Sequence, residues 1–499
     1  MTTMILQTAG QMIGGAVGGP VGAMIGQTLG SLAGSAIDGA LFGQTQKRVI
    51  EGPRLTEMQG LGSTEGAPIP RVYGRARIGG QLIWATRFEE KVNVRVERSG
   101  GGGKGGLGGG GVKTYEVSYS YFANIAIGLC EGEIAFVRRV WADGRELDLS
   151  NLTMRVYRGT QSQNPDALIV AKEGAAHAPA YRGLAYVVFE RLPIEQFGNR
   201  IPQFSFEVIR TLSGVAGMVR SVCLIPAATE FGYTPSGVMQ VIGPGTTRPD
   251  NRHQFQARSY VVASLDALQA LCPNLTGVSL VVSWFGDDLR VGQCRIAPRV
   301  EISQKQTEGG EWSVAGLTRS TADVVSLSNG VPAYGGTPSD DSVIALIRHL
   351  KARGLAVTLY PFIMMDIPAG NSLPDPRTGA SGQPPYPWRG RITCDPAPDR
   401  SGSVDGTAQA ATQVAAFFGS ASPSASEWSF RRHIMHYAQL AVAAGGVDAF
   451  VIGSEMISLT RIRSGSGVYP AVGHLCDLAA DVRAILGSGT RITYAADWT

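Results

Sequence analysis

An alternation of strand-like and helix-like segments after about residue 260 constrains the fold of this chain more than any other feature. Four apolar runs have the length and the β-branched or aromatic content of buried strands: 278–284, 356–365, 447–455 and 491–498. Three segments have helical spacing of apolar residues: 342–351, 426–445 and 470–486. Strands that alternate with helices favour a parallel sheet and, here, a TIM-like (β/α)8 barrel.

The predicted barrel is incomplete. With one further short strand near 324–333, we count about five of the eight strands that a closed barrel requires. The chain ends at Thr499, directly after a strand. We therefore expect residues 266–499 to form a partial barrel and the chain to be a fragment of a longer polypeptide.

The first 45 residues are rich in glycine and are predicted to be helical. The first charged residue is Asp38, and glycines recur at every fourth position at residues 10, 14, 18, 22, 26, 30 and 34. Such spacing places a glycine stripe on one helix face, where another backbone can approach closely. Because Pro20 interrupts the pattern, we expect two glycine-zipper helices, at 5–18 and 20–41. These helices either pack within an assembly or contact a membrane. The absence of a basic region before them argues against a signal peptide.

Residues 46–215 are predicted to form a β-rich domain. Apolar and polar residues alternate from Val92 to Glu97 and from Tyr115 to Tyr121. Between these runs, residues 99–112 are almost entirely glycine, which is typical of a flexible loop. The loop is not a phosphate-binding motif, because Lys104 is followed by glycine. Residues 216–265 are predicted to be a connector.

Composition excludes several classes of function. Forty-four Lys and Arg against 40 Asp and Glu give a net charge of +4, which is too small to indicate nucleic-acid binding. The six cysteines are scattered, so we expect buried free thiols and neither a zinc site nor a disulfide framework. His433 and His436 lie three residues apart without a carboxylate or cysteine pattern to complete a metal site. We expect no metal and no cofactor.

Several separated segments resemble one known family. They are 65–74 (EGAPIPRVYG), 129–134 (LCEGEI), 140–144 (VWADG), 179–189 (PAYRGLAYVVF) and 197–207 (FGNRIPQFSFE). Together they resemble the large tail-tip or baseplate protein of gene transfer agents and related tailed phages. These are hub or host-specificity proteins that carry a glycoside-hydrolase-like TIM barrel.

This resemblance implies a structural virion protein. It would form the tail hub as a homotrimer, together with other tail and baseplate proteins such as distal tail and hub proteins. It would be assembled in the bacterial cytoplasm and located at the tail tip. There it would contribute to recognition of a host envelope glycan and to delivery of DNA, which passes through the channel only as cargo. Residues 5–41 would be the segment that contacts a membrane.

The resemblance also assigns candidate site residues. Glu455 follows the predicted fourth strand, where retaining glycosidases of this barrel type place the acid/base, although here it lies in Gly-Ser-Glu where many relatives have Asn-Glu. Asp366 and Asp497 are candidates for hydrogen bonds to sugar, and Trp284 and Trp498 for stacking on sugar rings.

Three functions for the barrel follow from these assignments. One is a purely structural role, another is hydrolysis of a cell-wall or capsular glycan, and the third is glycan binding without catalysis. The second carboxylate that a retaining mechanism requires would lie beyond Thr499, so the enzyme assignment stays open.

Overall fold

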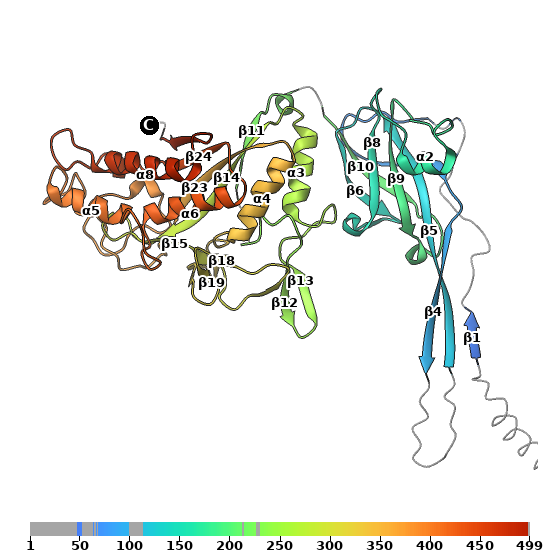
Figure 1. Ribbon diagram of the computed structural model, residues 1–499, viewed down its shortest axis with the longest axis horizontal. Helices are drawn as coiled ribbons and strands as arrows, with labels where there is room; N and C mark the ends of the chain where they lie inside the picture. The colour runs from blue at the N-terminus through green and yellow to red at the C-terminus, as the bar shows by residue number, and fades with distance from the viewer. Residues whose placement is uncertain are drawn as a thin grey trace, which may run out of the picture.

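The computed structural model describes residues 47–51, 63, 66, 68–98, 113–211, 214–225 and 230–497. Figure 1 shows a β-rich body, from which a long β-ribbon extends, followed along the chain by an α/β body. Arg252 of the α/β body donates hydrogen bonds to both carboxylate oxygens of Asp148 in the β-rich body, at 3.2 and 3.1 Å. The predicted helices at 5–18 and 20–41 and the loop at 99–112 lie outside the described residues.

A six-stranded sheet dominates the β-rich body. Its strands are β1 (Lys47–Glu51), β3 (Gln81–Ala85), β4 (Glu89–Arg98), β5 (Lys113–Glu131), β8 (Thr153–Arg158) and β9 (Leu184–Pro193). The 19-residue strand β5 pairs with β3 and β9 along one part of its length and with β4 and β1 along the other. β5 therefore organises this sheet, and the alternation predicted for 92–97 and 115–121 is confirmed as strand.

A second sheet packs against the first. It contains β2 (Gly74–Gly79), β10 (Phe204–Arg210), β6 (Phe136–Ala142) and β7 (Arg145–Glu146). Between the two sheets lies a core that includes Ile125, Ile127, Phe189 and Phe206, all with 0% exposure. Burying each such side chain contributes about 1.5–3 kcal/mol. Short helices border this core: η1 (Leu149–Asn151), α2 (Ala167–Glu173) and η2 (Glu195–Phe197).

The α/β body is built on parallel strands. Their order is β11 (Ser221–Leu224), β14 (Gly277–Gly286), β23 (Ala356–Met365), β24 (Ala449–Ser454) and β25 (Arg491–Ala495), and each pair of neighbours is parallel. β15 (Ile296–Ala297) adds a short antiparallel pairing at the end of β14. The predicted mixed α/β architecture with parallel strands is confirmed for this body.

Helices cover one face of this sheet. They are α3 (Tyr260–Leu271), α4 (Asp340–Ala352), α5 (Ala408–Phe418), α6 (Phe430–Ala443), α7 (Ile457–Thr460) and α8 (Pro470–Leu486), with η3 (Val215–Gly217) and η4 (Arg389–Arg391) between other elements. α8 has the bounds that the sequence predicts. In β23, odd-numbered residues such as Leu359 are buried toward these helices, whereas even-numbered residues such as Met364 are only half-buried.

One strand prediction is wrong. Residues 324–333 contribute to β20 (Asp323–Val324), β21 (Leu327–Ser328) and β22 (Val331–Pro332), which lie outside the parallel sheet. The fifth parallel strand is instead β11, which falls within the segment predicted as a connector. The remaining short strands are β12 (Met239–Gly243), β13 (Thr246–Pro249), β16 (Arg299–Val300), β17 (Gln306–Glu308), β18 (Ser313–Val314) and β19 (Leu317–Thr318).

The six cysteines are all free. The prediction of buried thiols is confirmed for four of them and wrong for Cys223 and Cys476, which are exposed. Among the described residues, no helix combines the length and apolar character that crossing a membrane requires.

The two faces of β23 predict unequal costs of truncation. Leu359→Ala should lower the free energy of unfolding by about 2–5 kcal/mol, because it leaves a cavity under the helices. Met364→Ala, on the half-buried face, should cost less than half as much. Urea denaturation of the full chain, followed by tryptophan fluorescence, measures both. An equal or larger loss for Met364→Ala would contradict the two-faced strand.

Candidate functional site

The carboxyl ends of the parallel strands gather acidic side chains at one edge of the sheet. Asp287 and Asp288 follow β14, Asp366 follows β23, Glu455 follows β24 and Asp497 lies two residues after β25. In parallel α/β folds this edge is where ligands bind, because the loops that follow the strands meet there. The edge is therefore the candidate functional site.

Glu455 is held in an unusual backbone conformation. Its φ of 51° lies in the left-handed region, and its N–H donates to the Ala495 carbonyl at 2.9 Å. A non-glycine residue in this region costs roughly 1–3 kcal/mol, and such residues cluster at functional sites. Its side chain is 40% exposed, so the strained turn presents the carboxylate to solvent at the end of β24.

Arg389 binds this carboxylate from a buried position. Its Nη2 donates to Glu455 Oε2 and to Ser454 Oγ, and its Nε donates to the Ser454 carbonyl at 3.0 Å. Its guanidinium lies 3.6 Å from the centroid of the Phe362 ring, as a cation–π contact. Burial lowers the pKa of Arg389, and Glu455 opposes that shift. The loop after β23 is thereby joined to the end of β24.

Trp388 completes this arrangement at the surface. Its Nε1 donates to Glu455 Oε2 at 3.2 Å, and the residue is 44% exposed. The indole lies against the backbone of Gly390, where an added Cβ would come within 2.4 Å of the ring. Both hydrogen bonds that the described residues make to Glu455 end on Oε2, so Oε1 remains available to a ligand beside a fixed aromatic ring.

The carboxylate of Asp366 accepts hydrogen bonds from other residues of the protein. Its side chain is fully buried and accepts hydrogen bonds from Arg299 Nη1 at 2.6 Å and from the Ser326 N–H at 3.0 Å. The Ser326 hydroxyl also donates to it. These contacts fix the segment that carries Ser326 to the end of β23. Asp366 therefore holds that segment at the edge of the sheet.

The other acids differ in their surroundings. Asp288 accepts hydrogen bonds from Arg290 and Gln383, whereas Asp287 accepts one from the Arg295 N–H and burial raises its pKa. Asp497 is half-buried. Trp498 lies outside the described residues.

Trp284 lies on the helix-facing side of the sheet and not at its edge. None of its surface is exposed, and its ring contacts those of Trp428, His433, His436 and Tyr437. The predicted stacking face is therefore covered by protein. Burial lowers the pKa of His433 to about 3, with His436 contributing to the shift. Within the described part of the chain, neither ring nitrogen of His433 has a hydrogen-bond partner.

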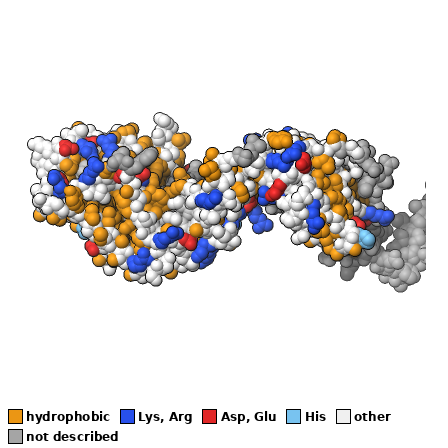
Figure 2. Space-filling model, turned by 90° about the horizontal axis from the view of Figure 1, so that it is seen from above, with side chains coloured by type: hydrophobic (Ala, Val, Ile, Leu, Met, Phe, Trp, Pro, Cys, Tyr) orange, Lys and Arg blue, Asp and Glu red, His pale blue; other side chains and the backbone are white. Residues whose placement is uncertain are grey.

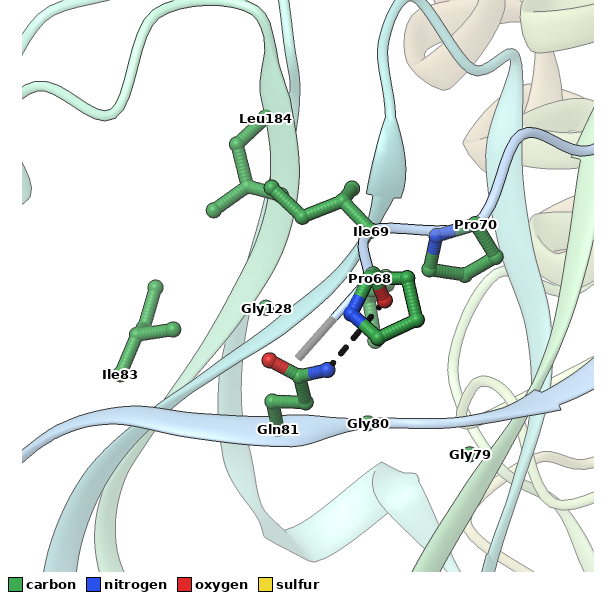
Figure 3. Close-up of a pocket in the computed structure, with 10 residues that line it drawn as sticks. Pro68, Ile69, Pro70, Gly79, Gly80, Gln81, Ile83, Gly128 and Leu184 are labelled. Carbon is green, nitrogen blue, oxygen red and sulfur yellow. Dashed lines mark hydrogen bonds between the residues drawn. The ribbon is translucent and has the colours of Figure 1, made fainter. Parts of the chain in front are cut away.

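Two cavities are lined mainly by apolar side chains. One, of about 510 Å³, lies on the half-buried face of the sheet against Phe285, Tyr360 and Phe362. The other, of about 360 Å³, lies in the β-rich body, where Figure 3 shows Pro68, Ile69 and Pro70 crossing near Gly80 and Gln81. Gln81 Nε2 donates to the Pro68 carbonyl at 3.4 Å. The residues that line this second cavity include no ionisable side chain.

The described residues contain no group of three or more His, Cys, Asp and Glu side chains arranged to hold a metal ion. Figure 2 shows Lys and Arg interspersed with Asp and Glu on the face seen from above, without a continuous basic field. At the edge, the half-exposed indole of Trp388 and the carboxylate of Glu455 place an aromatic face beside a hydrogen-bond acceptor.

Comparisons with known proteins point to one family for the C-terminal part. Residues 428–499 match the family model described as a GTA TIM-barrel-like domain. This segment contains α6, β24, α8 and β25, and it includes Glu455. No curated protein matches the chain.

Three solved structures that resemble the chain illustrate the similarity. One is a chain from the virion of a native gene transfer agent (GTA) particle, with 41% identity, coverage of 37% of this chain and 39% of that chain, and a TM-score of 0.24. A complex of a GH113 β-1,4-mannanase has 18% identity, coverage of 44% and 45%, and a TM-score of 0.22. The GH113 β-mannanase AaManA from Alicyclobacillus acidocaldarius, in complex with ManMIm, has 17% identity, coverage of 44% and 44%, and a TM-score of 0.23. The match spans less than half of each of these chains, and these TM-scores are too low to establish a common overall fold.

Sequence reasoning found Glu455 but missed Trp388 and Arg389. Both lie in the Pro- and Gly-rich stretch 371–405, between β23 and α5. The adjacent aromatic and basic residues were the only local signal, and no spacing rule connects them to Glu455, which is 66 residues from Arg389.

The buried imidazole of His433 predicts a pH dependence of stability. Unfolded histidine has a pKa of about 6.5, so below this pH the unfolded chain gains a proton that the folded chain does not take up until about pH 3. His433 should therefore reduce the free energy of unfolding by up to ~1.4 kcal/mol per pH unit as the pH falls through this window. His433→Phe should remove that contribution, as measured by urea denaturation at a series of pH values. The exposed His177→Gln serves as control, and an unchanged slope in His433→Phe would refute the assignment.

Proposed function

We propose that this chain is a structural component of the tail tip or baseplate of a phage-like particle of the gene transfer agent type. The observation that carries the proposal is the match of residues 428–499 to the GTA TIM-barrel-like family model. The motifs between residues 65 and 207, which resemble tail-hub segments, support the same assignment for the β-rich body. In this proposal the β-rich body forms the hub as a homotrimer with other tail proteins, and the α/β body faces the host envelope.

The strand-end edge supports a more specific role for the α/β body. We propose that it binds a host envelope glycan through Trp388 and Glu455. A pyranose ring can lie against the exposed face of the indole, while a sugar hydroxyl donates to Glu455 Oε1. Gly390 and Arg389 hold the two groups in place before a ligand arrives, which reduces the entropic cost of binding.

Glycan hydrolysis at Glu455 is the competing function. A retaining mechanism needs a second carboxyl group about 5–5.5 Å away in addition to the acid/base. Hydrolysis would release shortened products, whereas binding alone would not.

The location of the protein tests the structural proposal. An antibody raised against residues 270–499 and detected with gold should label purified particles at the distal end of the tail. Preincubation of the antibody with the purified chain should abolish the label. Label on the head or along the tail shaft, or protein found only free in the lysate, would contradict the proposal.

Substitutions at the edge test the glycan site. Trp388→Ala should weaken binding of soluble cell-wall or capsular oligosaccharides by about two- to twelvefold, because an aromatic contact contributes about 0.5–1.5 kcal/mol. Glu455→Gln should weaken binding by a smaller factor, because the amide oxygen still accepts a hydrogen bond. Isothermal titration calorimetry measures both, with Tyr73→Ala in the β-rich body as the exposed-aromatic control. Release of shortened products by the unmodified chain, lost in Glu455→Gln, would establish hydrolysis and overturn the binding-only proposal.

A further inference from the structure

The ribbon formed by β4 and the first half of β5 has one apolar face. Val92, Val94 and Val96 of β4 lie opposite Tyr119, Val117 and Tyr115 of β5, respectively. Because side chains alternate across a strand, these six lie on the same face. The opposite face carries Lys91, Asn93 and Arg95, paired with Ser120, Ser118 and Glu116. The ribbon is therefore amphipathic, like a strand pair that packs on a core.

The apolar face continues the core-facing side of the body. Tyr121 and Ala123 follow Tyr119 at alternate positions along β5, and both are buried in the core between the two sheets. In the body, the second sheet covers this side of β5. The second sheet does not extend along the ribbon, where Val92, Val94 and Val96 are 52%, 56% and 47% exposed.

An exposed apolar strip of this kind needs a partner. A strip of neighbouring valines marks a contact surface where single exposed valines would not. Figure 1 shows β4 and the lower part of β5 extending away from the body, with β1 beside them. The described elements of the body thus leave the strip for another segment to cover.

The chain itself brings a suitable segment to this place. β1 runs parallel to β5, and its first residue, Lys47, pairs with Lys113 at the outer end of the ribbon. The residues that precede β1 therefore join the ribbon at its outer end, along the edge of β5. Residues 1–37 contain no charged side chain, and their regularly spaced glycines permit close approach to another backbone.

We infer that the apolar face of the ribbon is the docking site for residues 5–41 of the same chain. The polar face is excluded because it would bury Lys91 and Arg95 against a segment that has no charged side chain before Asp38. The apolar face offers Val92, Val94, Val96 and Val117 to the apolar residues that flank the glycines. Docking continues the core of the body outward along the ribbon, and it goes beyond the role proposed above for the particle.

Hydrogen exchange of the full chain, measured by mass spectrometry at low protein concentration, tests this inference. Amides in residues 5–41 should exchange at least tenfold more slowly in the unmodified chain than in Val94→Asp, because the carboxylate cannot be buried against the segment. Ser118→Asp is the matched control: it adds the same charge to the opposite face of the same ribbon and should leave the protection unchanged. No protection of residues 5–41 in the unmodified chain would overturn the inference.

A second variant keeps the test independent of the ribbon's own folding. Val21→Asp changes only the docking segment and should abolish the protection of residues 5–41, while amides of Ile125 and Ile127 in the core stay protected. Protection that survives Val21→Asp would count against docking.

Two further measurements distinguish other occupants. Light scattering that shows a concentration-dependent increase in mass, abolished by Val94→Asp, would assign the face to a second copy of the chain. Binding to phosphatidylcholine–phosphatidylglycerol vesicles that Val94→Asp abolishes, without protection of residues 5–41 in solution, would assign it to lipid. Either result would overturn intramolecular docking.

Discussion

The parallel ladder between β14 and β23 is the interaction on which the α/β body depends. Its register runs from Gly277 opposite Ala356 to Gly286 opposite Met365 without a shift. Because the two strands end at the same level, the Asp366 N–H reaches the Gly286 carbonyl at 2.9 Å. The loop that carries Trp388 and Arg389 therefore starts from a fixed edge, which is why a long loop can place two side chains accurately.

The edge is then held by a buried cation. Removing a guanidinium from water costs several kcal/mol unless partners replace the lost hydration. Arg389 finds them in Ser454, Glu455 and the Phe362 ring, so the loop after β23 is attached to the end of β24. These contacts also help to offset the backbone strain at Glu455.

Sequence periodicity predicts those elements that are long enough to show a clear strand alternation or helical spacing of apolar residues. α8 and the alternating strands β4 and β5 belong to this group, whereas the four residues of β11 carry too little pattern to separate a strand from a connector. The predicted role of Trp284 exposes another limit, since β14 is apolar on both faces and its period does not reveal which side meets the helices. The position of Glu455 at the end of a predicted strand identifies it as a candidate site residue. Arg389 and Trp388 contact Glu455 only in the folded structure, and local sequence does not encode these tertiary contacts.

The same alternation has different consequences in the two bodies. In β23 one set of side chains meets the helices and the other faces a cavity, so both faces have defined surroundings within the fold. β5 is longer than the sheet that covers it, and its core-facing side chains continue past the body into the ribbon. When a strand is longer than the sheet that packs on it, the apolar side chains beyond that sheet are exposed, and their number grows with the extra length. The length of β5, together with its alternating pattern, therefore sets how much apolar surface the ribbon must place against another segment.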